Sequence, residues 1–409
     1  MLKTSLFATL LTVAATVAVA QPPAPPAGGR GPGPGRGGRV GSANGTPYTA
    51  LVSPEVHPDR TVTLRFRAPN ATQVDVVGEI MQGKGPLHMT KGEDGIWTAT
   101  LGPLPPEIWV YNFQVQGVAV PDPANAAVKP GPPGFQTASF VEVPGDTPAF
   151  YDSRPVAHGE VRMVLYESKP MGVTRWLWIY TPPNYDKSKA KYPVLYLLHG
   201  NGEAYTGWVM NGRANIILDN LIADKKAQPM IVVMPQGHAL QGPSVGPLVR
   251  LTGETEFFTK RFPPDLLEEI IPLVDRNYRV YADADHRAIA GLSMGGGQSL
   301  SIGLDHPDVF HYVLGFSGAV GGQYMDPEQV FAQALSKPDV LNSKLRLLWV
   351  GCGKQDFLYQ ANRNFVDMLN KKGVKVQFRE TEGSHVFSVW RNYLNETVPM
   401  LFTGVGKKK

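Results

Sequence analysis

From residue 192 onward, apolar strand-like runs alternate with helical stretches, and this alternation constrains the fold more than any other feature. Runs rich in Val, Leu, Ile and small residues have the length of buried strands, among them YPVLYLLHG, MIVVMPQG, RAIAGLS, YVLGFSG and LRLLWVGCG. Longer amphipathic stretches such as PPDLLEEIIPLVDRNY and NRNFVDMLNKKG lie between them. This order predicts a mostly parallel, doubly wound α/β sheet with helices on both faces. The preceding runs EVRMVLYES and TRWLWIYTP predict an antiparallel strand pair.

The segment before this α/β pattern has a different period. Residues 48–145 contain short runs of alternating apolar and polar residues, such as TVTLRFRAP, QVDVVGEI and WVYNFQVQG, with turn residues between them. Because no helical stretch intervenes, the pattern predicts a small all-β sandwich. We therefore predict a β-sandwich over 48–145 and an α/β domain over 158–405, joined by a short link.

The first 47 residues favour export. Residues 1–20 combine an early lysine, an apolar run and an A-V-A ending, which is typical of a secretory signal peptide cleaved after Ala20. A membrane anchor is the rival interpretation, but threonines interrupt the run, which is short for a span. Residues 21–47 are dominated by Pro, Gly and Ala, and this composition predicts a disordered linker. The mature protein is expected to be secreted or periplasmic, without membrane attachment.

Charge and cysteine content exclude several classes of function. The net charge is +4 over 409 residues, with much of the basic excess at the two ends, so no nucleic-acid surface is predicted. Cys352 is the single cysteine, which rules out an internal disulfide, and its place in an apolar run favours packing. No H-E-x-x-H motif, cysteine pair or close histidine–carboxylate cluster is present, so we expect neither a metal nor a cofactor.

The pentapeptide Gly291-Leu292-Ser293-Met294-Gly295 matches the nucleophile-elbow pattern G-x-S-x-G. This pattern is weak alone, but here a strand-like run precedes it and a helical run follows, as the elbow requires. The flanking glycines let backbone segments pass closely, which would expose the hydroxyl of Ser293 above the sheet edge. The sequence therefore predicts that Ser293 is a catalytic nucleophile.

A serine nucleophile needs a base, and the base needs an acid that orients it. His385 lies in the loop ETEGSHVFSVW between a predicted strand and helix, whereas His306 and His311 follow the elbow helix too closely. Asp356 follows the strand LRLLWVGCG, whereas Asp367 lies on the next predicted helix. We therefore predict a Ser293–His385–Asp356 triad.

An oxyanion hole and a substrate cleft should accompany the triad. One donor is expected from the N–H of Met294 and the other from Asn201 in LLHGNGEAYTGW, with Gly200 or Gly202 as alternatives. Trp208 is a candidate for the acyl pocket or for packing. Gln236 and His238 are further candidate substrate contacts at a strand end. The insertion over 239–262 is predicted to be a cleft loop.

The C-terminal part resembles the esterase D group of α/β-hydrolases, especially feruloyl and acetyl-xylan esterases. The likeness rests on stretches such as YPVLYLLHGNGE, AIAGLSMGG and GSHVFSVWRNYL, and it covers most of residues 158–402. It implies the same triad. Phe387 stands where the family often has tryptophan, so it is a candidate substrate contact that can alter the pocket wall. Residues 48–145 resemble the immunoglobulin-like carbohydrate-binding module of starch-branching enzymes, through TVTLRFRAPNATQVDVVGE and EDGIWTATLGPL.

These resemblances imply a secreted serine carboxylesterase that removes feruloyl, other hydroxycinnamoyl, or acetyl groups from plant cell-wall polysaccharide such as arabinoxylan. Its expected partner is the ester-bearing polysaccharide or oligosaccharide. One alternative is a siderophore trilactone esterase, because enterochelin esterases share an N-terminal β domain and a related catalytic domain. Another is a carbohydrate-binding protein on an inactive hydrolase scaffold, which would predict the loss of a triad residue.

Overall fold

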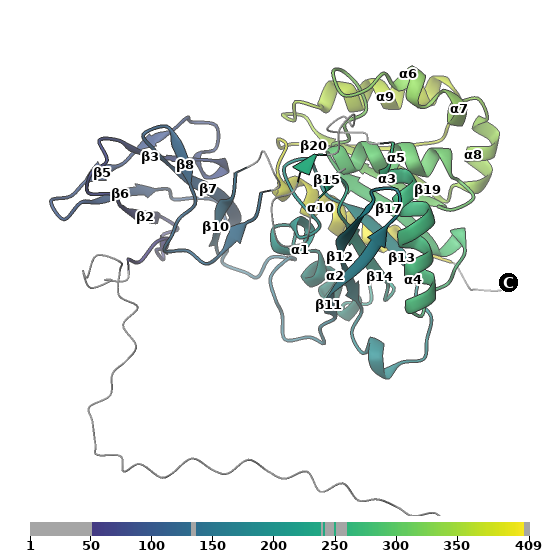
Figure 1. The fold of residues 1–409 in the computed structure, drawn as a ribbon, viewed down its shortest axis with the longest axis horizontal. Coiled ribbons are helices and arrows are strands. Elements are labelled where there is room, and N and C mark those ends of the chain that lie inside the picture. Colours follow the sequence, from purple (N-terminus) through teal and green to yellow (C-terminus); the bar gives the residue numbers. More distant parts are fainter. Residues whose placement is uncertain (1–50, 132–135, 239, 242–248, 251–259, 405–409) are drawn as a thin grey trace, which may run out of the picture. The chain divides into compact units, whose positions relative to one another are not determined.

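The computed structural model describes residues 51–131, 136–238, 240–241, 249–250 and 260–404 (Figure 1). The predicted signal peptide and linker, and most of the predicted cleft loop, lie outside these residues. All of these described residues belong to one compact unit. Among the described residues, none of the helices combines the length and the apolar character that a membrane crossing needs.

Residues 51–143, here called the β-region, contain two antiparallel sheets. One sheet has the strand order β1-β2-β6-β5, and the other has the order β4-β3-β7-β10-β9 with β8 paired to β7. Val62 and Leu64 of the first sheet share a hydrophobic core with Tyr111 and Phe113 of the second, so the two sheets pack on one another. The elements are β1 (Glu55–Val56), β2 (Val62–Arg67), β3 (Val74–Val77), η1 (Glu79–Met81), β4 (Leu87–His88), β5 (Thr90–Lys91), β6 (Ile96–Leu101), β7 (Glu107–Val115), β8 (Val118–Val120), β9 (Val128–Lys129) and β10 (Ala138–Val143).

An eight-stranded sheet organises residues 160–402, here called the α/β-region. Its order is β11-β12-β14-β13-β17-β18-β19-β20. β11, β12 and β14 pair antiparallel, and all pairs from β14 to β20 are parallel. The predicted mostly parallel sheet and the antiparallel strand pair are therefore confirmed. The strands are β11 (Glu160–Ser168), β12 (Val173–Thr181), β13 (Val194–Leu198), β14 (Ile231–Pro235), β17 (Arg287–Leu292), β18 (Tyr312–Phe316), β19 (Leu347–Gly353) and β20 (Gln377–Thr381); a separate pair comprises β15 (Leu240–Gln241) and β16 (Val249–Arg250).

Helices cover both faces of this sheet, as Figure 1 shows. Along β13, Val194 and Tyr196 enter one core, and Leu195 and Leu197 enter the other, because side chains alternate along a strand. Such a strand is apolar on both sides, which explains its continuous apolar run. The helical elements are η2 (Tyr185–Lys187), α1 (Gly207–Met210), α2 (Ala214–Ala223), α3 (Phe262–Pro264), η3 (Asp265–Ile270), α4 (Ile271–Asn277), η4 (Ala284–His286), α5 (Met294–Asp305), α6 (Pro327–Val330), α7 (Ala332–Leu335), α8 (Pro338–Lys344), α9 (Tyr359–Lys371), α10 (Phe387–Thr397) and η5 (Val398–Met400).

Ion pairs join the β-region to the α/β-region. Arg391 of α10, only 1% exposed, pairs with Glu107 of β7 and donates to the carbonyl of Asn211 at 2.6 Å. Arg213 pairs with Glu142 at 3.0 Å. Because one of these cations is buried, its carboxylate partner has to remain in place for the helix to pack.

Candidate active site

Ser293 lies in a strained turn between β17 and α5. Its φ is +53°, a value that non-glycine residues seldom adopt, and such strain concentrates at functional sites. The turn is tight enough to exclude a side chain on Gly295, where a Cβ would lie 2.5 Å from the carbonyl oxygen of His199. The strand–turn–helix context required for a nucleophile elbow is therefore present.

Asp356 and His385 come together from two neighbouring strands. Asp356 follows β19, and His385 lies between β20 and α10. His385 Nδ1 lies 2.8 Å from Asp356 Oδ2, and the second oxygen, Oδ1, accepts from the backbone N–H of Leu358 at 2.8 Å. The Asp356 side chain is fully buried, whereas 18% of the His385 side chain is exposed. A buried carboxylate held at Nδ1 leaves Nε2 as the nitrogen that can exchange a proton with a substrate.

Two aromatic side chains flank the imidazole of His385. The ring of Phe357 lies 4.5 Å from it and that of Trp390 lies 4.8 Å from it, measured between centroids. The Trp390 indole N–H donates to Ser317 Oγ at 3.1 Å, which fixes its ring. Phe357 is 67% exposed, which is unusual for a large apolar side chain next to the buried Asp356. Its position makes it a candidate contact for an apolar part of a substrate.

A cavity of about 300 Å³ gathers the predicted catalytic residues. Ser293, His385 and the loop Gly200-Asn201-Gly202 all line it. These residues follow different parallel strands, whose carboxyl ends meet at one edge of the sheet, the usual place for a site in this architecture. The complete lining is Glu79, Lys129, Gly200, Asn201, Gly202, Glu203, Leu292, Ser293, Ala319, Tyr324, Phe357, Leu358, His385 and Trp390.

The backbone groups expected to form the oxyanion hole lie beside Ser293. Met294 is the first residue of α5, so helix geometry leaves its N–H without an intrahelical acceptor. Gly200 packs against the nucleophile, because a Cβ on it would lie 3.3 Å from Ser293 Cβ. Gly200 and Asn201 line the cavity, and Met294 directly follows Ser293 in the chain without being part of the lining, so the two N–H groups stay the predicted oxyanion donors.

His199 holds the loop that contains Asn201. The N–H of Gly237 donates to His199 Nε2 at 2.9 Å, so the ring proton is on Nδ1, which lies 2.8 Å from the carbonyl oxygen of Gly200. Burial lowers the pKa of His199 to about 4, which keeps the ring neutral. These contacts give His199 a structural role in this loop.

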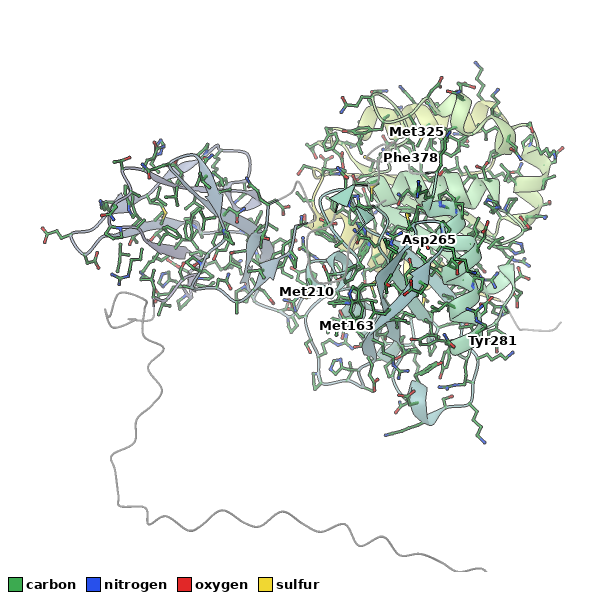
Figure 2. The ribbon with its side chains drawn as sticks, viewed as in Figure 1. Met163, Met210, Asp265, Tyr281, Met325 and Phe378 are labelled. Carbon is green, nitrogen blue, oxygen red and sulfur yellow. The ribbon has the colours of Figure 1, made fainter. Side chains whose placement is uncertain are left out.

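A buried ion pair supports the strand end behind this loop. Arg175 Nη1 lies 2.8 Å from Asp265 Oδ2, and both side chains are at most 3% exposed. Figure 2 labels Asp265, which lies inside the α/β-region. Arg175 Nη2 also donates to the carbonyls of Gln236 and His238, at 2.5 and 2.7 Å. The pair therefore fixes the segment that positions His199.

The four predicted substrate contacts lie outside the described lining of the cavity. Trp208 is 1% exposed, and its indole N–H donates to the carbonyl of Leu198 at 2.9 Å. Phe387 packs against Trp208 with ring centroids 5.6 Å apart. Gln236 Oε1 accepts from the N–H of Tyr205 at 3.1 Å, and His238 Nε2 lies 3.2 Å from the carbonyl oxygen of Glu203. His238 thus contacts the lining residue Glu203, and each of the four side chains has a partner within the protein.

Cys352 has the buried position that its sequence context indicated. It is fully buried in β19, and burial raises the pKa of its thiol to about 12. A thiol in this state is protonated at neutral pH and does not act as a nucleophile. Among the described residues, no group of three or more His, Cys, Asp or Glu side chains could hold a metal ion.

Among the cavity-lining residues that were not predicted from the sequence are Glu79, Lys129, Glu203 and Phe357. For two of them, the position in the sequence could have indicated a place near the site. Glu203 comes two residues after the predicted donor Asn201, and Phe357 directly follows the predicted acid Asp356. Glu79 and Lys129 belong to the β-region, and nothing in their local sequence indicates that they reach this cavity.

The Esterase family matches residues 168–401, more than half of the chain. The chain belongs to this family of esterases. A ferulic acid esterase of known structure is 28% identical, covers 60% of this chain and 98% of its own, and superposes with a TM-score of 0.53. The expected esterase family and the α/β-hydrolase type of its main sheet are therefore confirmed.

Relatives extend the match into the β-region. An endo-1,4-beta-xylanase/feruloyl esterase of Xylanibacter ruminicola is 33% identical over 85% of this chain and 46% of its own. An enterobactin esterase from Shigella flexneri is 20% identical, covers 84% of this chain and 93% of its own, and shares the fold with a TM-score of 0.63. The chain spans about half the length of the curated relatives it matches.

Proposed function

We propose that this esterase is a serine carboxylesterase that uses Ser293, His385 and Asp356. The observation that carries the proposal is the 2.8 Å His385–Asp356 contact together with Ser293 and His385 in one cavity. His385 Nε2 takes the proton of Ser293 Oγ as that oxygen attacks the ester carbonyl carbon. Asp356 keeps the ring proton on Nδ1 and stabilises the imidazolium that forms.

The N–H groups of Met294 and Asn201 donate hydrogen bonds to the carbonyl oxygen and stabilise the negative charge that develops on it. His385 then gives its proton to the departing alcohol oxygen, which leaves an acyl group on Ser293. His385 then takes a proton from a water molecule as the water oxygen attacks the acyl carbon, and it gives that proton to Ser293 Oγ as the bond between Oγ and the acyl carbon breaks and the carboxylic acid leaves. No metal or cofactor takes part in this scheme.

We propose that the substrate is a feruloyl, other hydroxycinnamoyl, or acetyl ester on a polysaccharide such as arabinoxylan. The 33% identical relative is named a xylanase/feruloyl esterase, which supports this substrate class. The cavity also supports it, because Leu292, Phe357, Leu358 and Trp390 give part of the lining an apolar surface that suits an aromatic acyl group. Export through a signal peptide cleaved after Ala20 would bring the protein to such a substrate.

A siderophore trilactone is a second candidate. It is favoured by the likeness to an iron(III) enterobactin esterase of Escherichia coli, which is 22% identical over 68% of this chain. The two candidates differ in the alcohol released, because a trilactone yields hydroxy-acid units and a xylan ester yields a free sugar hydroxyl. Product analysis therefore separates them.

The test measures product release from methyl ferulate, acetylated xylan, enterobactin and a p-nitrophenyl ester, with wild type and Ser293→Ala. The matched control is Ser301→Ala, which removes a hydroxyl about two turns further along α5. We expect ferulate or acetate from wild type and Ser301→Ala, and none from Ser293→Ala. Hydrolysis of enterobactin alone would support the second candidate, and equal activity of Ser293→Ala would contradict the mechanism.

A further inference from the structure

The β-region contributes charged side chains to the cavity that contains Ser293. Glu79 of η1 and Lys129 of β9 line it together with Glu203 of the loop after β13. We call these three residues the polar wall. The remaining lining that is not part of the predicted machinery is mostly apolar, so the polar wall gives the cavity two chemically different sides.

An ion pair organises the polar wall and leaves one oxygen unused. Lys129 Nζ lies 2.9 Å from Glu203 Oε1, and their side chains are 18% and 6% exposed. The second oxygen, Glu203 Oε2, is buried and has no hydrogen-bond partner among the described residues. A buried carboxylate oxygen is a strong acceptor, and leaving it without a donor is unfavourable. This oxygen therefore lacks a donor that the described part of the chain could supply, and a bound molecule can provide one.

The unused oxygen lies close to the nucleophile. A Cβ built on Gly200 would be 3.3 Å from Ser293 Cβ and 3.7 Å from Glu203 Oε2. The two atoms are thus separated by no more than the sum of these distances. A molecule bonded to Ser293 can reach Glu203 within the same cavity.

The charges of the polar wall select the kind of group that fits. Two carboxylates face one ammonium group, so a substrate carboxylate or phosphate would be repelled. An uncharged O–H donates to a carboxylate and also accepts from an ammonium group. Burial raises the pKa of Glu79 to about 7. The charge of Lys129 lowers this pKa, and the charge of Glu203 raises it. Arg391 and Glu107, which also face Glu79, act in opposite directions.

We propose that the polar wall is a subsite for a hydroxyl group of the substrate, so that the β-region forms part of the substrate-binding site. This inference rests on the proposed esterase function. The hydroxyl comes either from the phenol of a hydroxycinnamoyl acyl group or from the sugar that carries the ester. Glu203 Oε2 accepts its hydrogen bond, and Lys129 holds Glu203 in place.

Pairs of substrates that differ in their hydroxyl groups test this proposal in the full-length protein. Methyl p-coumarate and methyl cinnamate differ by the phenol alone. Feruloyl-arabinose and methyl ferulate share an acyl group and differ in the alcohol. For each pair, kcat and KM are measured with wild type, Glu203→Gln and Lys129→Met. The control is Glu142→Gln, which removes an exposed ion pair between the same two regions outside the cavity lining.

We expect Glu203→Gln to lower kcat/KM about tenfold or more for the hydroxylated member of one pair, and little for its partner. A loss for p-coumarate but not for cinnamate identifies the phenol, and both ferulates then lose alike because both carry it. A loss for feruloyl-arabinose but not for methyl ferulate identifies the sugar. Lys129→Met should follow the same pattern, and Lys129→Arg should restore much of the activity. Glu142→Gln should match wild type with every substrate.

An equal loss for both members of both pairs would overturn the proposal, because the polar wall would then only position the oxyanion loop. Unchanged kinetics in Glu203→Gln would overturn it as well. Thermal melting of each variant separates these outcomes from misfolding, and Glu203→Gln keeps the side-chain volume. If wild type hydrolyses none of the four esters, the proposed function itself fails, which is a different result.

Discussion

Replacing Asp356 by asparagine tests the assignment of the triad acid in detail. The carboxylate is bonded on both oxygens, with Oδ2 2.8 Å from His385 Nδ1 and Oδ1 2.8 Å from the Leu358 nitrogen. Asparagine has only one acceptor oxygen, and the Leu358 N–H is a fixed donor. The amide oxygen therefore stays with Leu358, and the NH₂ group faces His385. This arrangement forces the ring proton onto Nε2, the nitrogen that has to accept a proton from Ser293.

The size of the effect follows from burial. The Asp356 side chain is fully buried, so solvent neither screens its charge nor replaces its contact with the imidazole. In Ser-His-Asp enzymes the wrong tautomer lowers kcat about 10⁴-fold. We expect a fall of about 10³- to 10⁴-fold here, equivalent to roughly 4–5.5 kcal/mol of activation free energy. The melting temperature should change little, because the bond to Leu358 is kept.

The assay is steady-state hydrolysis of a p-nitrophenyl ester, with melting temperatures measured in parallel. Asp367→Asn is the matched control, since Asp367 lies exposed on α9, the helix that follows Asp356. It should retain wild-type kcat. A folded Asp356→Asn protein with kcat within tenfold of wild type would refute the tautomer argument, and an equal loss in both variants would refute the assignment.

Three further predictions concern the elbow, the polar wall and the buried ion pair. Gly295→Ala should lower kcat about a hundredfold, measured with the same ester, because its Cβ would meet the His199 carbonyl oxygen at 2.5 Å and displace Ser293. Glu79 has a pKa near 7 when folded, against 4.5 otherwise, so its contribution to stability is lost as pH rises from 4.5 to 7. Between pH 5 and pH 7.5, the free energy of unfolding of wild type, measured in urea, should fall by about 2 kcal/mol relative to that of Glu79→Gln. Arg175→Met leaves Asp265 buried without its cation, so the free energy of unfolding measured in urea should fall by about 3–5 kcal/mol. The double variant Arg175→Met/Asp265→Asn should recover much of this loss.

Local patterns in the sequence were sufficient to predict the main sheet and the family. Strand β13 is apolar at consecutive positions because both of its faces are buried, and that run is visible without a structure. The elbow around Ser293 was equally visible, since its glycines and its strand–helix context are contiguous in the chain. Ser293, His385 and Asn201, to which the sequence assigned catalytic roles, line one cavity. The roles themselves stay predictions.

The full lining of the cavity could not be predicted in the same way, and the substrate contacts stay predictions. Trp208 and Phe387 are large aromatic residues, and the sequence pattern of such residues is the same in a core as in a pocket. Lys129 reaches the cavity from a strand more than 70 residues before Glu203, and only the packing of the β-region brings them together. Their meeting depends on tertiary structure, which no period or motif near Lys129 encodes.

The contacts of Arg391 limit how the β-region can be exchanged or removed. The side chain belongs to the helix that follows His385, and it joins that helix both to Asn211 and to Glu107 of the β-region. Exchanging the β-region for an unrelated module would leave a buried guanidinium group without its carboxylate. The two regions are therefore expected to be transferable between proteins only as a unit, and a minimal catalyst cut at residue 158 would lack both a stabilising partner and part of its cavity.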